Sequence, residues 1–276
     1  MSADVVLRAI TKDGAFRVIT ARTTSSARGV TGAQRVKGAT ARVLAELLTG
    51  TVLMREAMAP DLRVQGLLQV GKTRLVADAY PDGATRALVQ GGDPEVGAGG
   101  VLQMMRSLHN GSVQQGIVRV AGGDMSTALM EYMQSSEQVA SFIAVAAVLE
   151  GDAVAHAGGY LVQLLPEVGR APLMVMTERL ADFTPLPTLL TTGKGSPEEL
   201  MTELLYAMPH DLVGRSTVRF ACPCDETRVA ASLASLPKAD IKEMLDDGKV
   251  LEIQCDYCGR EYRFAPEKLR GLLAQS

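Results

Sequence analysis

The only four cysteines of the 276-residue chain fall in two close pairs near its C-terminal end. Cys222 and Cys224 form a CxC motif, Cys255 and Cys258 form a CxxC motif, and residues 225–254 separate the two pairs. Four soft ligands in two tight bends of the chain are the donor set of a tetrahedral Zn²⁺ site. We therefore predict that these four side chains bind one zinc ion per chain.

The same four thiolates could also act as a redox switch. Around one ion, with Zn–S bonds of about 2.3 Å, tetrahedral sulfurs lie about 3.8 Å apart, which is close to disulfide range. Structural zinc contributes on the order of 10–16 kcal/mol to folding a finger-sized unit, whereas a disulfide across a three- or four-residue loop contributes about 1.6 to 1.9 kcal/mol. Four cysteines allow three pairings, and pairing of sequence neighbours is a hypothesis from proximity. If neighbours do pair, the module should lose its fold.

Several longer segments carry a resemblance. They are Phe-Ala-Cys-Pro-Cys at 220–224, Ser-Leu-Pro at 235–237, Glu-Ile-Gln-Cys-Asp-Tyr-Cys-Gly-Arg-Glu-Tyr-Arg-Phe at 252–264, Glu-Tyr-Met-Gln-Ser-Ser-Glu-Gln at 131–138 and Ala-Gly-Gly-Tyr-Leu-Val-Gln-Leu-Leu-Pro at 157–166. In this arrangement the chain resembles the 33-kDa heat-shock protein family, whose members are cytoplasmic holdase chaperones activated by oxidation. The cysteine pattern is the specific part of the resemblance, and the upstream motifs support it.

The resemblance implies how such a switch would work. Reduced protein would hold zinc and be inactive, and oxidation would form Cys222–Cys224 and Cys255–Cys258, release the metal and unfold the module with the segment before it. Apolar side chains of that segment would then bind unfolded client proteins without ATP; they are Leu180, Phe183, Leu186, Leu189, Leu200 and Leu204. The resemblance also implies a homodimer in the active state, a role in the stress response and no enzymatic activity.

Composition and charge agree with a soluble protein of the reducing cytoplasm. The net charge is −3, which gives no bulk attraction to nucleic acid or to an anionic membrane. The N-terminus has neither a basic region nor a long apolar region, so we expect no secretory signal. Apolar runs are far shorter than a membrane-spanning helix needs. In this compartment, paired cysteines more often bind metal or react with oxidants than form structural disulfides.

The pattern along the chain predicts an α+β fold in three parts. These are an N-terminal core domain of mixed sheet and helix at 1–175, a metastable helical linker at 176–220, and a zinc-binding redox-switch domain at 221–276. In the core, alternation around Asp13-Gly14 predicts a hairpin, and helical spacing of apolar residues predicts one long helix over 34–58.

Further core elements are expected downstream. Residues 113–120 have the pattern of a strand, and residues 125–133 that of a short helix with Asp124 or Ser126 as its N-cap. Two strongly apolar strands should then form a hairpin across Glu150-Gly-Asp152, with Gly158-Gly159 marking a bulge or a close approach of backbone.

In the linker and the final module, proline, glycine and capping residues mark where helices and strands begin and end. In the linker, Pro185 and Pro187 interrupt a helical stretch, and Ser196-Pro-Glu-Glu199 predicts a capping box that opens a second helix to about Met208. In the module we expect helices at 227–236, 237–247 and 266–273, and strands at 250–254 and 260–264 that flank the CxxC turn.

One motif suggests a different class of function. Residues 66–73, Gly-Leu-Leu-Gln-Val-Gly-Lys-Thr, match the phosphate-loop pattern GxxxxGK[ST] letter for letter. A phosphate loop needs a strand before it and a helix after it, but here the middle residues and residues 74–80 favour strands. We therefore predict a hairpin at this point and no nucleotide site.

Other candidate sites are weak. The glycines at 91–92 and 97–100 predict a surface loop, and His109, His156 and His210 are scattered without a partner nucleophile. A zinc-ribbon adaptor for nucleic acid or protein is the alternative binding function, but acidic residues surround the cysteines and leave no basic face. Steeply salt-dependent nucleic-acid affinity would favour that adaptor, and nucleotide binding lost on changing Lys72 would favour an enzyme.

Overall fold

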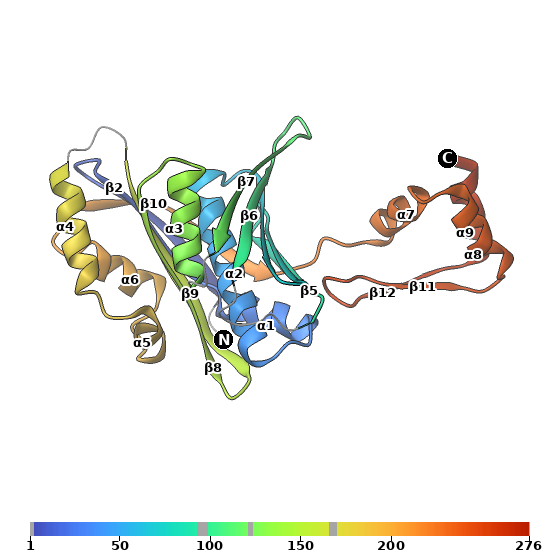
Figure 1. Cartoon of the computed structure of the whole chain (residues 1–276), viewed down its shortest axis with the longest axis horizontal. Coiled ribbons are helices and arrows are strands. Elements are labelled where there is room, and N and C mark those ends of the chain that lie inside the picture. The colour runs from blue at the N-terminus through green and yellow to red at the C-terminus, as the bar shows by residue number, and fades with distance from the viewer. Residues whose placement is uncertain (1–2, 93–98, 121–123, 166–169, 276) are drawn as a thin grey trace. The chain divides into compact units, whose positions relative to one another are not determined.

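The computed structural model describes residues 3–92, 99–120, 124–165 and 170–275. The chain divides into two compact units, Met1–Ala221 and Cys222–Ser276. Figure 1 shows a large unit of sheet and helix and a small unit. The small unit contains all four cysteines. The α+β fold with a C-terminal four-cysteine module is therefore as predicted.

The large unit is built on one curled sheet. In the described part of the chain it has ten strands in the order β7-β6-β3-β4-β5-β10-β1-β2-β9-β8, and every neighbouring pair is antiparallel except β5 and β10. The strands are β1 (Asp4–Thr11), β2 (Phe16–Arg22), β3 (Arg63–Val70), β4 (Thr73–Ala79), β5 (Ala84–Gln90), β6 (Gly100–Ser107), β7 (Val113–Val120), β8 (Ser141–Glu150), β9 (Ala153–Leu164) and β10 (His210–Phe220).

The main hydrophobic core lies between the two halves of this sheet and surrounds one buried helix. Helix α2 (Gly38–Met58) lies in the hollow of the sheet, with α1 (Thr24–Ala33) and α3 (Met125–Ser135) beside it (Figure 1). The helix predicted over 34–58 thus begins four residues later, after Arg35 takes a left-handed φ of 54°. Gly50 does not interrupt it: a Cβ there would lie 2.5 Å from Leu129 of α3, so the glycine permits close helix packing.

A second hydrophobic core covers the opposite face of β1, β2 and β9. Successive residues of a strand point to opposite faces, and here Val18 belongs to the second core while Ile19 belongs to the first. The helices that cover this face are α5 (Leu186–Thr191) and α6 (Pro197–Leu204), and α4 (Arg170–Ala181) adds Met176. The predicted capping box is confirmed, because Ser196 and Glu199 exchange their side-chain and backbone hydrogen bonds.

The hairpin predictions are confirmed, including the one that overlaps the phosphate-loop pattern. Strands β3 and β4 are antiparallel neighbours, with Val70 opposite Thr73 across the turn at Gly71, and no helix follows the turn among the described residues before β5. Gly66 instead allows β3 to pack closely against α2, because a Cβ at this position would lie 2.4 Å from Thr51 Oγ1 of α2. The backbone at Gly159 is equally close to its neighbours, since a Cβ there would lie 2.7 Å from the carbonyl oxygen of Ala144.

Several features of the large unit differ from the sequence-based expectations. Helix α1 and strand β5 have no counterpart among the predicted elements, and α6 ends at Leu204, short of the predicted Met208. Strand β6 begins at Gly100, inside the predicted surface loop; residues 93–98 of that loop lie outside the described residues. Strand β10 occupies the last part of the segment predicted as a helical linker and pairs with β1 from Asp4↔Val218 to Thr11↔His210. A strand therefore connects the helices α5 and α6 to the cysteine module along the chain.

The small unit has the elements that the sequence predicts, with shifts of a few residues. They are α7 (Glu226–Ala234), α8 (Lys238–Asp246), β11 (Leu251–Gln254), β12 (Glu261–Phe264) and α9 (Pro266–Gln275). Its buried apolar residues in the described part are Ile241 and a cluster of Leu233, Tyr262, Phe264 and Leu269. So small a core supplies little stability by itself. None of the described helices of either unit is long and apolar enough to cross a membrane.

Candidate metal centre

The four cysteines come from two bends of the small unit. Cys222 and Cys224 lie just before α7, whose N-cap Asp225 accepts a hydrogen bond from the backbone N–H of Arg228. This cap starts the helix immediately after the second thiol and so fixes the end of the first bend.

The second bend is the turn between β11 and β12. The backbone N–H of Cys258 donates to the carbonyl of Cys255 at 3.3 Å, and the N–H of Gly259 donates to the same carbonyl at 2.7 Å. Gly259 has a φ of 71°, a left-handed conformation that favours glycine. The turn therefore holds both thiols on one side of the hairpin end.

These bends bring the four sulfur atoms together. All four Sγ atoms lie within 4.8 Å of one another, and each side chain is half-buried. Sulfurs about 3.8 Å apart are expected around a Zn²⁺ ion with four thiolate ligands. The donor set is four soft sulfurs with neither carboxylate nor imidazole among them, and it therefore fits zinc in its chemistry as well as in its spacing.

The closest sulfur contacts join the two bends. Cys222 Sγ lies 3.8 Å from Cys255 Sγ, and Cys224 Sγ lies 3.3 Å from Cys258 Sγ. The described residues include all four cysteines and contain no disulfide. The geometry of the reduced state therefore does not by itself select the predicted pairing of sequence neighbours, and that pairing remains a prediction.

The Cys224 and Cys258 thiols have different pKa values because their environments differ. Burial works to raise the pKa of the Cys224 thiol, but interactions with Tyr262 and the other three thiols outweigh burial and lower that pKa to about 7. Burial, followed by the neighbouring thiols, raises the pKa of Cys258 to about 12. In the metal-free cluster, negative charge thus settles first on Cys224.

The predicted client-binding side chains all lie in or against the second core. Leu186, Leu189, Leu200 and Leu204 are buried there, and Leu180 and Phe183 pack against it half-buried. The ring of Phe183 meets that of Tyr160 edge-on, with 5.4 Å between the ring centres. In this state the apolar surface of α5 and α6 is covered by the sheet.

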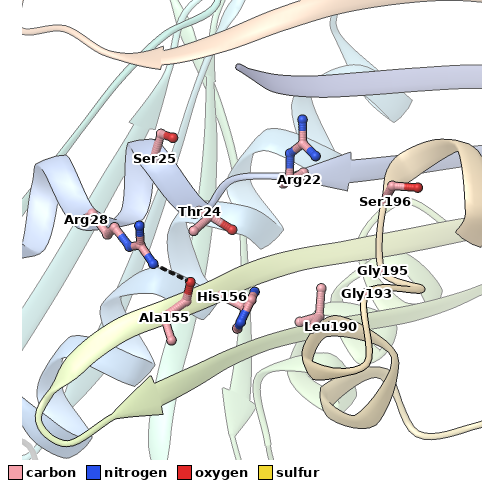
Figure 2. A pocket seen from close by; sticks show the side chains of 10 residues that line it. All are labelled: Arg22, Thr24, Ser25, Arg28, Ala155, His156, Leu190, Gly193, Gly195 and Ser196. Carbon is pink, nitrogen blue, oxygen red and sulfur yellow. Dashed lines mark hydrogen bonds between the residues drawn. The ribbon is translucent and has the colours of Figure 1, made fainter. Parts of the chain in front are cut away.

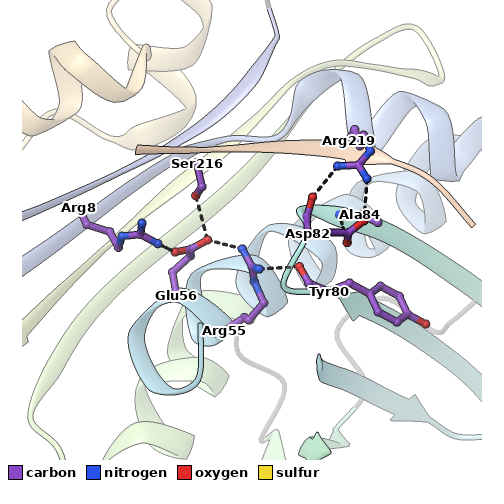
Figure 3. Close-up of polar contacts among 8 residues, drawn as sticks. All are labelled: Arg8, Arg55, Glu56, Tyr80, Asp82, Ala84, Ser216 and Arg219. Atoms are coloured by element: carbon purple, nitrogen blue, oxygen red, sulfur yellow. Dashed lines mark hydrogen bonds and ion pairs between the residues drawn. The ribbon is translucent and has the colours of Figure 1, made fainter. Parts of the chain in front are cut away.

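A buried cluster of charges, which no sequence motif indicates, holds β10 in the sheet. Glu56 of α2 is nearly inaccessible, and its carboxylate accepts hydrogen bonds from Arg8 of β1, Arg55 of α2 and Ser216 of β10 (Figure 3). Arg55 also donates to the carbonyl of Tyr80 at the end of β4. Burial, together with the positive charge of Arg8, lowers the pKa of Arg55 to about 10, so Arg55 is still protonated at neutral pH.

A second attachment lies at the end of β10 nearest the cysteines in sequence. Arg219 donates to the backbone carbonyl of Asp82 and, at 2.7 Å, to its carboxylate (Figure 3). The backbone N–H of Ala221 donates to the carbonyl of Thr85 at 2.9 Å. The sequence signal for this strand is weak, and consists of the alternation of Arg215, Thr217 and Arg219 with less polar residues.

Comparisons with known proteins were made for the whole chain. A family model described as "Hsp33 protein" matches residues 4–265. A protein of Syntrophotalea carbinolica named "33 kDa chaperonin" is 29% identical over 98% of this chain and 99% of its own. The Bacillus subtilis protein of the same name is 28% identical over 99% of each chain. The crystal structure of the 33 kDa chaperonin of Thermotoga maritima has a TM-score of 0.85 at 19% identity and covers 99% of both chains, which supports the fold.

Proposed function

The chain belongs to the Hsp33 family, and on this basis we propose that it is a redox-regulated, ATP-independent chaperone that holds unfolding proteins during oxidative stress. The observation that carries the proposal is the convergence of four thiols from two bends within 4.8 Å, in a unit whose own apolar core is minimal. Such a unit depends on whatever links its bends. A change in that link can therefore decide whether the unit is folded.

In the reduced state, we propose that Cys222, Cys224, Cys255 and Cys258 hold one Zn²⁺. When bound, the ion would supply a cross-link between the bends and would stabilise all four thiolates. The N-cap of α7 and the turn before Gly259 orient the thiols for this purpose. The chaperone is inactive in this state, because the apolar faces of α5 and α6 are packed against the sheet.

Peroxide converts the four thiols into two disulfides. A thiolate attacks one peroxide oxygen to give a sulfenic acid, the O–O bond breaks and hydroxide leaves as water after protonation. A second thiolate then attacks the sulfenic sulfur, forms the S–S bond and displaces another hydroxide. Each disulfide consumes one peroxide and two electrons are taken from the sulfurs, so full oxidation uses two peroxides per chain and leaves no thiolate to hold a metal.

We propose that sequence neighbours pair once the first thiol is oxidised, as Cys222–Cys224 and Cys255–Cys258, and the short loops between them support this pairing. Loss of the metal link loosens the unit, and the cross-bend partners, which are 33 and 34 residues apart in sequence, then separate. For a flexible chain, closing a loop of about three residues costs about 2 kcal/mol less than closing one of about thirty-three. Neighbouring thiols therefore meet more often, and the disulfides they form do not tie the two bends together.

Unfolding of the small unit would then release the linker. We propose a core domain at 1–175, a linker at 176–220 and a redox-switch domain at 221–276. The part of the linker before β10 would leave the sheet and expose Leu180, Phe183, Leu186, Leu189, Leu200 and Leu204, which would bind apolar segments of unfolded clients. The active form would be a homodimer in the cytoplasm that acts by binding, without catalysis and without nucleic-acid or membrane partners.

The test follows zinc and chaperone activity in the same sample. Purified reduced protein is treated with peroxide, zinc release is followed with a chromogenic chelator, and suppression of client aggregation is measured before and after treatment. We expect about one zinc released per chain and suppression only afterwards, reversed by a thiol reductant. Cys222→Ser should lack the switch, whereas Lys72→Ala, in the β3–β4 turn, should behave as the unmodified protein. Equal suppression before and after oxidation, with zinc retained, would favour a permanent zinc adaptor.

A further inference from the structure

A cavity of about 330 Å³ lies where the linker helices meet the core sheet, away from the cysteines in sequence. Its walls come from three places: the end of β2 and the start of α1, strand β9, and the loop between α5 and α6 (Figure 2). The residues used below are Arg22, Ser25, Arg28, His156, Leu190 and Ser196. A volume of this size is at the small end of ligand-binding cavities.

The lining of the cavity includes two arginines and no acidic side chain in the described part of the chain. Arg22 and Arg28 have no ion-pair partner among the described residues, and no acidic side chain in that part of the chain lines the cavity. Arg22 donates to the carbonyl of Ala3 through Nη2, but its Nε is buried and without a partner in the described part. Neither guanidinium has an anionic partner in the described part of the chain, and an anion in the cavity would supply one.

The other polar groups are arranged in keeping with this charge. Arg28 donates to the carbonyls of Val154 and Ala155, both at 2.7 Å, and this anchors its guanidinium beside β9. Two carboxylates accept hydrogen bonds from residues that line the cavity. Asp4 accepts from the backbone N–H groups of Ser25 and Ser26, and Glu199 accepts from Ser196.

We propose that this cavity binds a small tetrahedral oxyanion, either free phosphate or the phosphate group of a small phosphomonoester. Arg22 and Arg28 would provide charge and hydrogen-bond donors, Ser25 a hydroxyl, and His156 a further ring N–H at the rim. The Leu190 side of the cavity is apolar and accommodates an organic remainder. N–H and O–H donors that reach the cavity from several directions suit the oxygens of a tetrahedral anion better than they suit chloride.

Occupation of this site would stabilise the docked linker. Leu190 and Ser196 belong to the segment around the α5–α6 loop, whereas Arg22 and His156 belong to the core, so the complete site exists only while α5 and α6 are docked. At a phosphate concentration one hundred times the Kd, the undocked fraction would fall about 100-fold. This consequence bears on the proposed function, but the binding itself does not depend on it.

The test is a calorimetric titration of inorganic phosphate into the reduced, zinc-loaded full chain, with chloride used to keep ionic strength constant. We expect one saturable site per chain. His156→Glu, at an exposed position of the cavity rim, and Arg22→Gln should each weaken binding at least tenfold. Arg74→Gln is the matched control, because it removes the same charge from an exposed position on β4 and should leave binding unchanged. Circular dichroism of each variant establishes that it is folded.

Two further measurements distinguish the possible ligands and test the effect of binding on the linker. Glycerol 3-phosphate that binds more tightly than inorganic phosphate would support a phosphomonoester ligand, and weaker binding would support the free anion. Amide hydrogen exchange over 186–204 should slow with phosphate in the reduced protein, which needs no chaperone assay. No saturable binding, an equal loss in Arg74→Gln, or unchanged binding in a folded His156→Glu variant would overturn the proposal.

Discussion

The carboxyl groups of Glu46 and Glu56, both on α2, lie in different surroundings. Glu46 on α2 is largely buried, and the loss of hydration raises its pKa from 4.5 to about 7. The positive charge of Arg42 and a hydrogen bond from the backbone of Ala147 oppose this shift, and Asp124 adds to it. Glu56, near the end of the same helix, is buried as well but is surrounded by two arginines and a serine hydroxyl. The Glu46 carboxyl is thus shifted toward its neutral form, whereas the Glu56 carboxylate has two arginine partners.

The raised pKa of Glu46 predicts how stability depends on pH. Between pH 4.5 and about 7 the native state keeps a proton that the unfolded state has released, so stability falls as pH rises through this range and the loss is complete above it. The full effect is about 3 kcal/mol. Glu46→Gln should therefore raise the free energy of unfolding at pH 8 by up to that amount and change it little at pH 4.

The measurement is urea unfolding followed by circular dichroism, because the chain has no tryptophan. Glu131→Gln, at an exposed position of α3, is the control and should have no effect at either pH. A stabilisation by Glu46→Gln that is the same at pH 4 and pH 8 would contradict this explanation.

At the scale of elements, β10 and the two helices before it differ in how many contacts hold them to the rest of the large unit. Strand β10 is paired on both sides and held by the buried cluster around Glu56 and by Arg219 with Asp82. Helices α5 and α6 are short and stay in place through one apolar face and the capping box at Ser196. We therefore expect the helices to detach from the sheet while β10 remains in it.

The buried cluster should contribute far more than a surface ion pair on the same strand. Glu56→Gln leaves the buried Arg55 and the half-buried Arg8 beside an uncharged amide and should destabilise the large unit by about 3–5 kcal/mol. Glu198→Gln removes the exposed partner of Arg215 and should cost less than about 1 kcal/mol. Urea unfolding gives both values, and amide exchange of β10 should rise only for Glu56→Gln. Similar costs for the two variants would show that the cluster does not hold the strand.

The stability of α6 should set how readily the chaperone is activated. Ser196→Ala removes the N-cap and should cost about 1 kcal/mol, which raises the detached fraction about fivefold. Thr202→Ala, at an exposed position of the same helix, should act in the opposite direction because alanine has the higher helix propensity. The half-time of activation by peroxide, measured without phosphate, should shorten for the first variant and lengthen for the second. A shift in the same direction for both would argue against α6 as the controlling element.

At the scale of the whole molecule, the two units differ in what makes them stable. The large unit has two extensive cores, whereas the small unit has a few buried apolar side chains and the cysteine cluster. Removal of the metal from reduced protein by a strong chelator should therefore unfold residues 222–275, release α5 and α6 and leave the sheet of the large unit folded. Hydrogen exchange with mass spectrometry would show this as loss of protection in the small unit and in α5 and α6, while the sheet stays protected. Full protection without metal would mean that the small unit folds by itself.

The small unit is predictable from sequence because its signals are local. Closely spaced cysteines, the cap at Asp225 and the stop at Gly248 each act within a few residues. Helix α1 and strand β10 are hard to predict from sequence because their residue types suit contacts with distant parts of the chain, and not the local helix or strand. A Cβ at Gly29 of α1 would lie 2.6 Å from Phe220 of β10, so the glycine that weakens the helix signal is needed where the two elements touch. Neither the cavity at Arg22 nor the cluster at Glu56 leaves a pattern in sequence, since their members are far apart in the chain.

The central claim is that oxidation replaces a link between two bends with links inside each bend. It is tested most directly by mapping the disulfides of peroxide-treated protein by peptide mass spectrometry, with hydrogen exchange of residues 222–275 measured on the same material. We expect Cys222–Cys224 and Cys255–Cys258 together with loss of protection throughout the small unit. Disulfides Cys222–Cys255 and Cys224–Cys258, which join the sulfurs closest in the reduced structure, in a unit that stays protected would contradict the claim.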